Sequence, residues 1–439
     1  MRLNYAYKDK YLFTASNRWD GSSVLAEGAK WENFPSLALG WKISKESFLE
    51  NNSTISDLKL RASIGYTGNN NVAAYTSQAL LNQQTFYANG STLVPGWQSK
   101  TLANQSLTWE KTKELNIGLD FGFLNNRITG SIDAYDRLSD KLIYAQQLPI
   151  ETGWPSTISN VGSVSNKGIE VLLTTKNIKT KNVAWETTFT FTKNVNALES
   201  IYNQDQVSDI GNNLLIGEPL RSNYNYVYDG IWQESEAAEA ATYNQKPGQA
   251  RPKDLNGDKK FDSNDRTTIG NPNPEWQGSL YSKLNVGQFD FNFSVITSQG
   301  QTVLSSFHDN FADVTDRGRQ KIAMDYFIPT NGAGLEANAS TSNPRPGPQA
   351  TGAGTFWASN FAFYREVSYV KIKNISIGYT LDSDLLKRLK MSNFRIYVNI
   401  LDPFVFTDFD GYDPEWAASS LGINRPASIT TQLGLSVKF

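Results

Sequence analysis

Apolar and polar residues alternate along many stretches of this chain, most clearly in Leu115–Ser139. The first arm of that stretch carries an apolar residue at every second position, namely Leu115, Ile117, Leu119, Phe121 and Phe123. A period of two predicts a strand with one apolar face and one polar face. Leu124-Asn125-Asn126 predicts a tight turn, because Asn tolerates left-handed backbone. The return arm alternates again, so we predict an antiparallel hairpin with strands of about nine residues, the length that a tilted strand needs to cross a bilayer.

The same alternation predicts further strands along the chain. They cover Arg2–Tyr7, Tyr11–Arg18, Leu37–Ile43, Leu58–Ile64, Lys167–Asn177, Val183–Asn194, Gly278–Asn285, Gln288–Ser298, Val367–Thr380, Asn393–Leu401 and Ser428–Phe439. Long polar stretches at residues 67–106, 140–165, 198–275 and 300–360 read as loops, with short helical turns at Lys45–Asn52 and Ala237–Ala241. About 12 to 14 strands with short turns on one side and long loops on the other are typical of outer-membrane barrels. We therefore predict an all-β fold, an antiparallel transmembrane β-barrel portion that spans residues 1–439.

Composition excludes several classes of function. The chain has 439 residues, a formal net charge of −2, no Cys and one His, His308. The near-neutral charge offers no broad attraction for nucleic acid. Because the chain has no Cys, we expect no thiol chemistry. Because His308 is the single His, we assign it no role and expect no His-based metal centre or Ser/His/Asp triad. An enzyme is therefore not expected.

The chain also lacks the usual signals for reaching a membrane. No apolar run approaches the roughly 18 residues of a transmembrane helix. The start, MRLNYAYKDKYLF, has no apolar core of a signal peptide and reads as a strand. Because an outer-membrane barrel must be exported, we expect that Met1 is not the true start or that the chain is a fragment.

One loop carries oxygen ligands at the spacing of an EF-hand calcium loop. The candidate ligands are Asp254, Asn256, Asp258, the carbonyl of Lys260, Asp262 and Asp265. Two residues depart from the pattern, because Lys259 replaces the usual Gly and Asp265 replaces the longer Glu. The loop either binds Ca²⁺ or another hard cation, which would stiffen an extracellular loop, or forms a solvated turn rich in Asp and Asn. No other cofactor is expected.

Aromatic and acidic loop residues are further candidates for chemistry. Four tryptophans in predicted loops are candidate substrate contacts, namely Trp97, Trp154, Trp357 and Trp416. Their rings could stack on sugars, lie at the membrane interface or anchor the cores of the loops. The acids Asp408, Asp410, Asp413 and Glu415 could suggest glycosidase carboxylates, but their polar context favours a solvated loop.

Several of these stretches together resemble the C-terminal part of the SusC/RagA family of TonB-dependent outer-membrane transporters. The matching segments run in family order: Tyr11–Ser23, Phe34–Ser44, Leu58–Asn69, Leu107–Arg127, Asn160–Glu170, Asp254–Gly270, Tyr369–Thr380 and the terminal Phe439. The resemblance implies about a dozen strands of a larger barrel in the bacterial outer membrane. The family's signal peptide, plug domain and first barrel half have no counterpart in this sequence.

The resemblance also implies a function and partners. A SusD-like surface lipoprotein captures a glycan or peptide in this family, and the TonB–ExbB–ExbD complex pulls on the plug through the N-terminal part. This chain would contribute wall in contact with outer-membrane lipid, and the loops at 67–106, 198–275 and 300–360 would contact partner and substrate. Two alternatives remain open. One is a soluble or surface β protein that binds carbohydrate, with its apolar faces packed between two sheets, and the other is a small passive porin.

Overall fold

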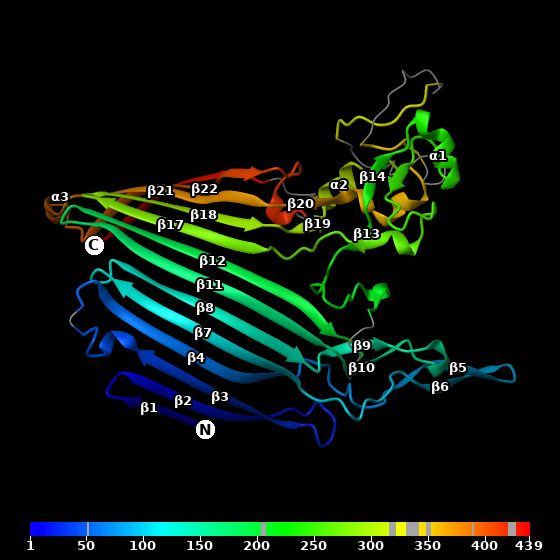
Figure 1. Ribbon diagram of the computed structural model, residues 1–439, viewed down its shortest axis with the longest axis horizontal. Coiled ribbons are helices and arrows are strands. Elements are labelled where there is room, and N and C mark those ends of the chain that lie inside the picture. Colours follow the sequence, from blue (N-terminus) through cyan, green and yellow to red (C-terminus); the bar gives the residue numbers. More distant parts are fainter. Residues whose placement is uncertain are drawn as a thin grey trace. The chain divides into compact units, whose positions relative to one another are not determined.

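A computed structural model describes residues 1–50, 52–202, 208–315, 322–330, 342–347, 353–388, 390–419 and 427–439 of the chain. The chain divides into two compact units, Met1–Leu220 and Arg221–Phe439. Long antiparallel strands dominate both units (Figure 1). The described residues contain thirteen such strands, within the predicted range of 12 to 14.

Eight of these strands belong to the first unit, and each pairs antiparallel with its neighbour (Figure 1). In the order of the sheet they are β1 (Arg2–Tyr7), β2 (Tyr11–Gly21), β3 (Trp31–Lys42), β4 (Ile55–Asn69), β7 (Glu110–Phe123), β8 (Ile128–Asp140), β11 (Ser163–Lys179) and β12 (Val183–Ser200). The other five belong to the second unit: β17 (Trp276–Val286), β18 (Phe289–Gln299), β21 (Tyr369–Thr380), β22 (Asn393–Thr407) and β23 (Thr430–Lys438). Sequence neighbours pair in both units, as expected when tight turns join the strands.

The hairpin of β7 and β8 confirms the predicted alternation and turn. Leu119 faces Ile132 across the ladder, and Phe123 faces Ile128. The turn residues Leu124, Asn125 and Asn126 all have positive φ, between 54° and 56°. The strands are 14 and 13 residues long, longer than predicted. The additional residues are polar and continue the strand pairing beyond the apolar stretch, where Lys111 pairs with Asp140.

The apolar faces of the long strands are exposed. Ile117 on β7 is 52% exposed and Leu433 on β23 is 78% exposed. The buried apolar clusters of the described residues lie mainly in loops and at strand ends, for example Leu25 with Leu107 and Phe361 with Phe363. The alternative of a soluble protein with two packed sheets is therefore wrong, because that fold would bury the apolar strand faces.

Ion pairs lie on the opposite, polar face of the strands. In the first unit, Arg61 contacts Asp120 at 2.8 Å and Asp133 at 3.0 Å. Gly118 lies between them, and a Cβ there would come within 2.5 Å of the Asp133 carboxylate. The missing side chain therefore lets Arg61 on β4 reach across β7 to β8. In the second unit, Arg395 pairs with Asp290 in the same way, across Gly378.

Three of the four predicted long loops in fact contain paired strands, and the fourth does so in part. In the first unit, β5 (Leu81–Asn89) pairs with β6 (Thr92–Ser99), and β9 (Ile143–Gln147) pairs with β10 (Ser156–Asn160). The prediction of a long loop at 67–106 was wrong in part, because residues 81–99 form a strand pair whose alternation is too weak to be recognised in the sequence. The 3₁₀ turn η1 (Ile43–Lys45) comes just before the predicted helical turn at 45–52, and within that range the backbone of Glu50 donates to the Glu46 carbonyl, as in one helical turn. The elements η2 (Ile150–Thr152) and η3 (Ile210–Asn212) are further short turns.

The loops of the second unit form small paired and helical elements. The strand pairs are β13 (Tyr224–Tyr226) with β16 (Arg266–Thr268), β14 (Tyr228–Ile231) with β15 (Ala250–Pro252), and β19 (Thr302–Leu304) with β20 (Tyr364–Glu366). The helices are α1 (Ala237–Thr242), which confirms the predicted helix, α2 (Ser306–Phe311) and α3 (Ser383–Arg388). The 3₁₀ turns are η4 (Glu234–Glu236), η5 (Ser263–Asp265), η6 (Thr355–Ser359), η7 (Phe361–Phe363) and η8 (Pro414–Trp416). No helix in the described part of the chain has the length and apolar character to span a membrane.

Candidate functional site

The richest polar constellation surrounds residues Asp408–Ala417, which follow β22 and which we call the anchored segment. Its Phe409 and Ala417 pack with Val303 and Val367 in a small buried cluster. The Ala417 carbonyl also accepts a hydrogen bond from the backbone of Ser306 at the start of α2. Two sets of charged side chains hold the segment in addition to these contacts.

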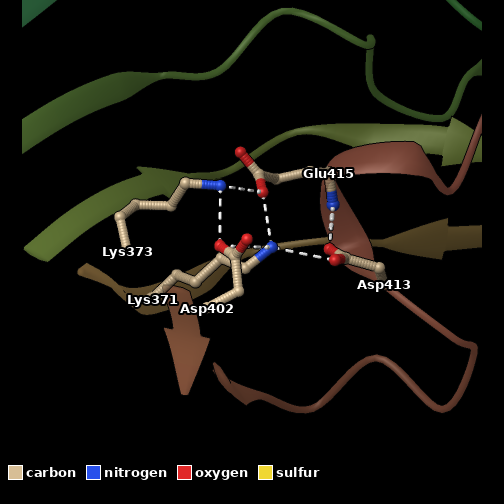
Figure 2. A network of polar contacts seen from close by, with 5 residues as sticks. All are labelled: Lys371, Lys373, Asp402, Asp413 and Glu415. Carbon is tan, nitrogen blue, oxygen red and sulfur yellow. Dashed lines mark hydrogen bonds and ion pairs between the residues drawn. The ribbon is translucent and has the colours of Figure 1, made fainter. Parts of the chain in front are cut away.

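The first anchor is the ammonium group of Lys371 on β21 (Figure 2). Lys371 is only 2% exposed. Its Nζ donates to Asp413 at 2.8 Å and to Glu415 at 2.5 Å. Lys373, on the same face of the strand, contacts Asp402 at 2.8 Å and Glu415 at 3.2 Å. Figure 2 shows the two ammonium groups converging with the three carboxylates. The network thus joins β21, β22 and the anchored segment.

A bulge in β22 brings Asp402 into this network. Ile372 pairs with Phe404 and Asn374 with Leu401, so two residues of β22 oppose one residue of β21. Asp402 occupies the bulge with φ of 51°. Because a bulge re-aims a side chain out of the regular alternation, the Asp402 carboxylate can meet Lys373.

The second anchor is His308 on α2. Its Nε2 lies 2.8 Å from an Asp410 carboxylate oxygen, and its Nδ1 lies 2.8 Å from the Ser305 hydroxyl. Arg365 approaches the same Asp410 oxygen at 4.0 Å. The Tyr412 ring packs against Phe307, with centroids 4.8 Å apart. The sequence expectation that His308 is isolated and without a role is therefore wrong, because tertiary packing brings it to Asp410.

The electrostatics of the two anchors differ. Burial, and then the nearby Arg365, lower the pKa of His308 below its ordinary value. Burial alone would raise the pKa of Glu415, but the hydrogen bonds from Lys371 and Lys373 outweigh it and lower that pKa. At neutral pH the second anchor therefore rests on a neutral imidazole, whereas the first rests on full ion pairs.

Ser305, His308 and Asp410 are the residue types of a hydrolytic triad, but their arrangement does not suit that chemistry. Ser305 is fully buried, and its hydroxyl also accepts from the His308 backbone as the N-cap of α2. A nucleophile must reach a substrate carbonyl, which a buried capping hydroxyl cannot do. These three residues therefore hold α2 and the anchored segment together.

The acids of the anchored segment divide into two groups. Asp408 and Asp410 are exposed, as the expectation of a solvated loop requires. For Asp413 and Glu415 that expectation is wrong, because Asp413 is buried and both side chains bind Lys371. Asp413 also accepts from the backbone of Glu415 and so caps η8.

The four candidate tryptophans lie in different surroundings. Trp97 on β6 is well exposed, Trp154 is half-buried after η2, and Trp416 is 46% exposed on the anchored segment. Trp357 is buried in the core of the second unit's loops, where its Nε1 donates to Asp313 at 2.8 Å. Its ring thus anchors the loop core, one of the alternatives left open by the sequence, and offers no face to a substrate.

The EF-hand-like loop closes on itself through its own carboxylates. Asp265 is fully buried and accepts from the backbones of Leu255 and Asp262. Asp254 accepts from the backbone of Lys259, and Lys259 has φ of 63° at the position that EF-hands give to Gly.

The other candidate ligands of this loop are more exposed. Asn256, Asp258 and Lys260 are exposed, and Asp262 is half-buried. Among the residues that the structure describes, no group of three or more His, Cys, Asp or Glu side chains is placed to hold a metal ion. Calcium binding at this loop therefore stays a prediction.

The polar side of the first unit carries an open hollow of about 400 Å³. Hydroxyl side chains from β2, β3, β4 and β7 contribute to its lining, namely Ser16, Ser36, Ser63, Thr67 and Thr112. The hydroxyl oxygens of Ser16 and Ser36 lie 2.7 Å apart. Hydroxyls both donate and accept hydrogen bonds, so this wall suits a hydrated or polyhydroxylated solute.

Comparison with known proteins identifies the family. A family model described as "TonB dependent receptor-like, beta-barrel" matches residues 1–401. The chain belongs to this TonB-dependent receptor family. It is 33% identical to TonB-dependent receptor SusC of Bacteroides thetaiotaomicron over 460 residues, which cover 100% of this chain and 43% of the relative. It is 30% identical to TonB-dependent receptor P39 of Formosa agariphila over 456 residues, covering 94% of this chain and 43% of that relative.

Solved structures agree on the fold of this TonB-dependent receptor chain. The structure of the RagAB peptide transporter matches with a TM-score of 0.80 at 21% identity, over 100% of this chain and 47% of the other. The receptor chain thus spans about half the length of the curated relatives that it matches. The SusC/RagA resemblance is confirmed, and the protein is an outer-membrane β-barrel protein.

Sequence reasoning missed the residues that hold the anchored segment of this receptor. Lys371 and Lys373 stand two apart in YVKIKN, so the period of two already places both on one strand face. Two lysines on one strand face indicate acidic partners nearby, and the sequence contains this signal. Which acids they meet depends on how the segment after β22 folds back, and the local pattern does not contain that information.

Proposed function

We propose that this chain forms wall and outer loops of a TonB-dependent importer that takes up a nutrient, either a glycan or a peptide. One observation carries the proposal: the long strands expose an apolar face, while the opposite face carries ion pairs and hydroxyls. The apolar face suits contact with lipid, and the polar face suits an aqueous path through the protein, as in outer-membrane barrels. The antiparallel ladder between the strands satisfies the backbone groups that would otherwise face the bilayer. The role is transport rather than catalysis.

A SusD-like surface lipoprotein is the proposed partner at the loops. The hairpin of β5 and β6 supports this proposal, because its register places Phe86 opposite Pro95 and Ala88 opposite Leu93. That face therefore gathers exposed apolar side chains, namely Phe86, Leu93 and Trp97. Exposed aromatic anchors on one face are typical of the centre of a protein interface.

The energy for transport would come from TonB–ExbB–ExbD. Their contact would lie in the part of the relatives that this chain does not match. Since a relative in fold is described as a peptide transporter, peptides stand beside glycans as the proposed cargo.

Deletion and complementation of the gene in the source bacterium test this function. We expect the deletion to abolish uptake of one class of radiolabelled probe, neutral hexasaccharides or tryptic casein peptides, and complementation to restore it. Uptake should also stop when TonB is removed. Uptake that persists without TonB would indicate a passive pore, and unchanged uptake of both probes in the deletion strain would refute the importer.

A further inference from the structure

The anchored segment buries one of its aromatic rings and leaves two others partly exposed. Phe409, Asp413 and Ala417 are buried, whereas Tyr412 is 44% exposed and Trp416 is 46% exposed. Burial of the Tyr412 and Trp416 rings would contribute a large apolar area. The segment instead holds these two rings at the surface while its backbone is fixed between them.

Directional polar contacts, rather than apolar packing, fix the position of η8 in the anchored segment. Removing the Lys371 ammonium from water is costly, and well-packed apolar residues often stabilise as well as a buried ion pair. What the ion pairs add here is geometry, since Lys371 binds Asp413 and Glu415 at once. Asp413 caps the turn η8, and Glu415 lies within that turn. The position of Trp416, the last residue of η8, thus depends directly on Lys371.

The Tyr412 ring is held from the other side. It lies edge-on against Phe307, with centroids 4.8 Å apart, and against Phe311 at 6.2 Å. Tyr and Trp lose little side-chain entropy on binding, and rings that are already fixed lose less. The Tyr412 ring is thus preorganised, and together with the half-exposed Trp416 ring on the same short segment it suits a flat ligand with apolar faces.

The charge of the segment narrows the class of ligand. Asp408 and Asp410 on the same segment are exposed, and His308 contacts only one carboxylate oxygen of Asp410. Carboxylates accept hydrogen bonds from hydroxyls but repel acidic groups. A pyranose ring offers C–H faces for stacking and hydroxyls for the carboxylates, and a neutral sugar escapes the repulsion.

We propose that Lys371 is a positioning residue, which holds the anchored segment so that Tyr412 and Trp416 form a stacking surface for a neutral oligosaccharide. The inference rests on the proposed function, because the oligosaccharide would be the transported substrate or part of it. Lys371 does not contact the sugar and acts through η8.

Uptake kinetics of the intact receptor test the inference. Cells carrying wild-type or variant receptor are given radiolabelled neutral hexasaccharides of glucose, xylose and mannose, and outer-membrane abundance is measured for every variant. We expect Trp416→Ala to raise KM for the transported hexasaccharide by about tenfold with kcat unchanged, as loss of a binding contact requires. Lys371→Met should raise KM by a similar factor, and Lys371→Arg should restore part of it.

Two further variants separate positioning from general stability. Lys371→Met combined with Trp416→Ala should be no worse than Trp416→Ala alone, because both act on one contact. Lys387→Met is the control: Lys387 on α3 is an exposed lysine that pairs with Asp384 at 3.4 Å, outside the network that holds the anchored segment. We expect Lys387→Met to change KM little.

Several results would overturn the inference. An unchanged KM in Trp416→Ala would show that Trp416 does not stack on the oligosaccharide, even if Lys371→Met fails to accumulate in the membrane. Additive losses in the double variant show that Lys371 acts elsewhere. Wild-type uptake of tryptic casein peptides but of no hexasaccharide rejects the ligand class while leaving the importer intact. Uptake of neither probe by wild type rejects the proposed function and the inference together.

Discussion

A single imidazole illustrates how much one residue does in this protein. His308 joins α2 to the anchored segment through Asp410, with Arg365 close to the same carboxylate. Its hydrogen bond to Ser305 completes the contacts of both ring nitrogens. The chain has no other His, so any imidazole signal reports on this contact alone.

We predict that acid lowers the stability of the fold around His308, because burial and Arg365 disfavour the charged imidazole although Asp410 favours it. The pKa of His308 is lowered in the folded chain, from about 6.5 in an unfolded one, so the unfolded chain binds more protons between the two values. Stability is therefore complete above about pH 6.5 and declines as the pH falls through that value toward the folded pKa. An NMR titration of the imidazole should give a midpoint below about 6.5. A midpoint above that value, or equal acid sensitivity in His308→Gln, would contradict this.

Asp265 should be essential for the EF-hand-like loop whether or not a metal binds. Asp265→Ala removes the acceptor of two backbone amides, and we expect a local loss of about 1–3 kcal/mol. Limited proteolysis and amide exchange of the loop measure it. Asp258→Ala is the control, because Asp258 is exposed, accepts from the backbone of Lys260 and should matter less.

The calcium prediction for the same loop is tested separately. If the loop binds Ca²⁺, added calcium should slow its cleavage in the wild type, and EDTA should reverse the effect. Asp254→Asn should abolish the response, because Asp254 holds the first ligand position. Cleavage rates that ignore both calcium and EDTA would show that the carboxylates only close the turn.

At the scale of elements, the hairpin of β5 and β6 is the clearest candidate for contact with a partner protein. We expect Phe86→Ser combined with Trp97→Ser to abolish co-purification of the surface lipoprotein while leaving the receptor abundant in the membrane. The reason is the loss of aromatic anchors, each commonly a centre of interface energy. Thr92→Ser, on the opposite face of the hairpin, is the control. Unchanged co-purification would exclude this face.

At the scale of the whole molecule, two opposite faces of the same strands meet different surroundings. We predict that Ile117→Arg, on the exposed apolar face, lowers outer-membrane abundance, because a cation facing lipid costs about 2–4 kcal/mol at the bilayer midplane. Asn116→Arg, one residue earlier on the polar face, should be tolerated. Heat-modifiable gel mobility and membrane fractionation measure both. Equal tolerance of the two variants would argue against lipid at the Ile117 face.

Sequence alone determined the strands, the tight turns and the family. A period of two and a turn such as Leu124-Asn125-Asn126 are local, so they can be read without knowing what packs against them. The strands β5 and β6 could not be predicted in this way, because their apolar and polar residues alternate too weakly. The resemblance to SusC needed only the order of short motifs, and the comparisons confirmed it.

Only the tertiary structure decided the candidate site. Lys371 and Asp413 are 42 residues apart, and their contact depends on how the chain returns after β22. The same holds for His308, which sequence left without a role, and for Trp357, which folding buried. Burial and pairing between distant residues are set by packing of the whole unit, and a local pattern of apolar and polar residues carries no record of them.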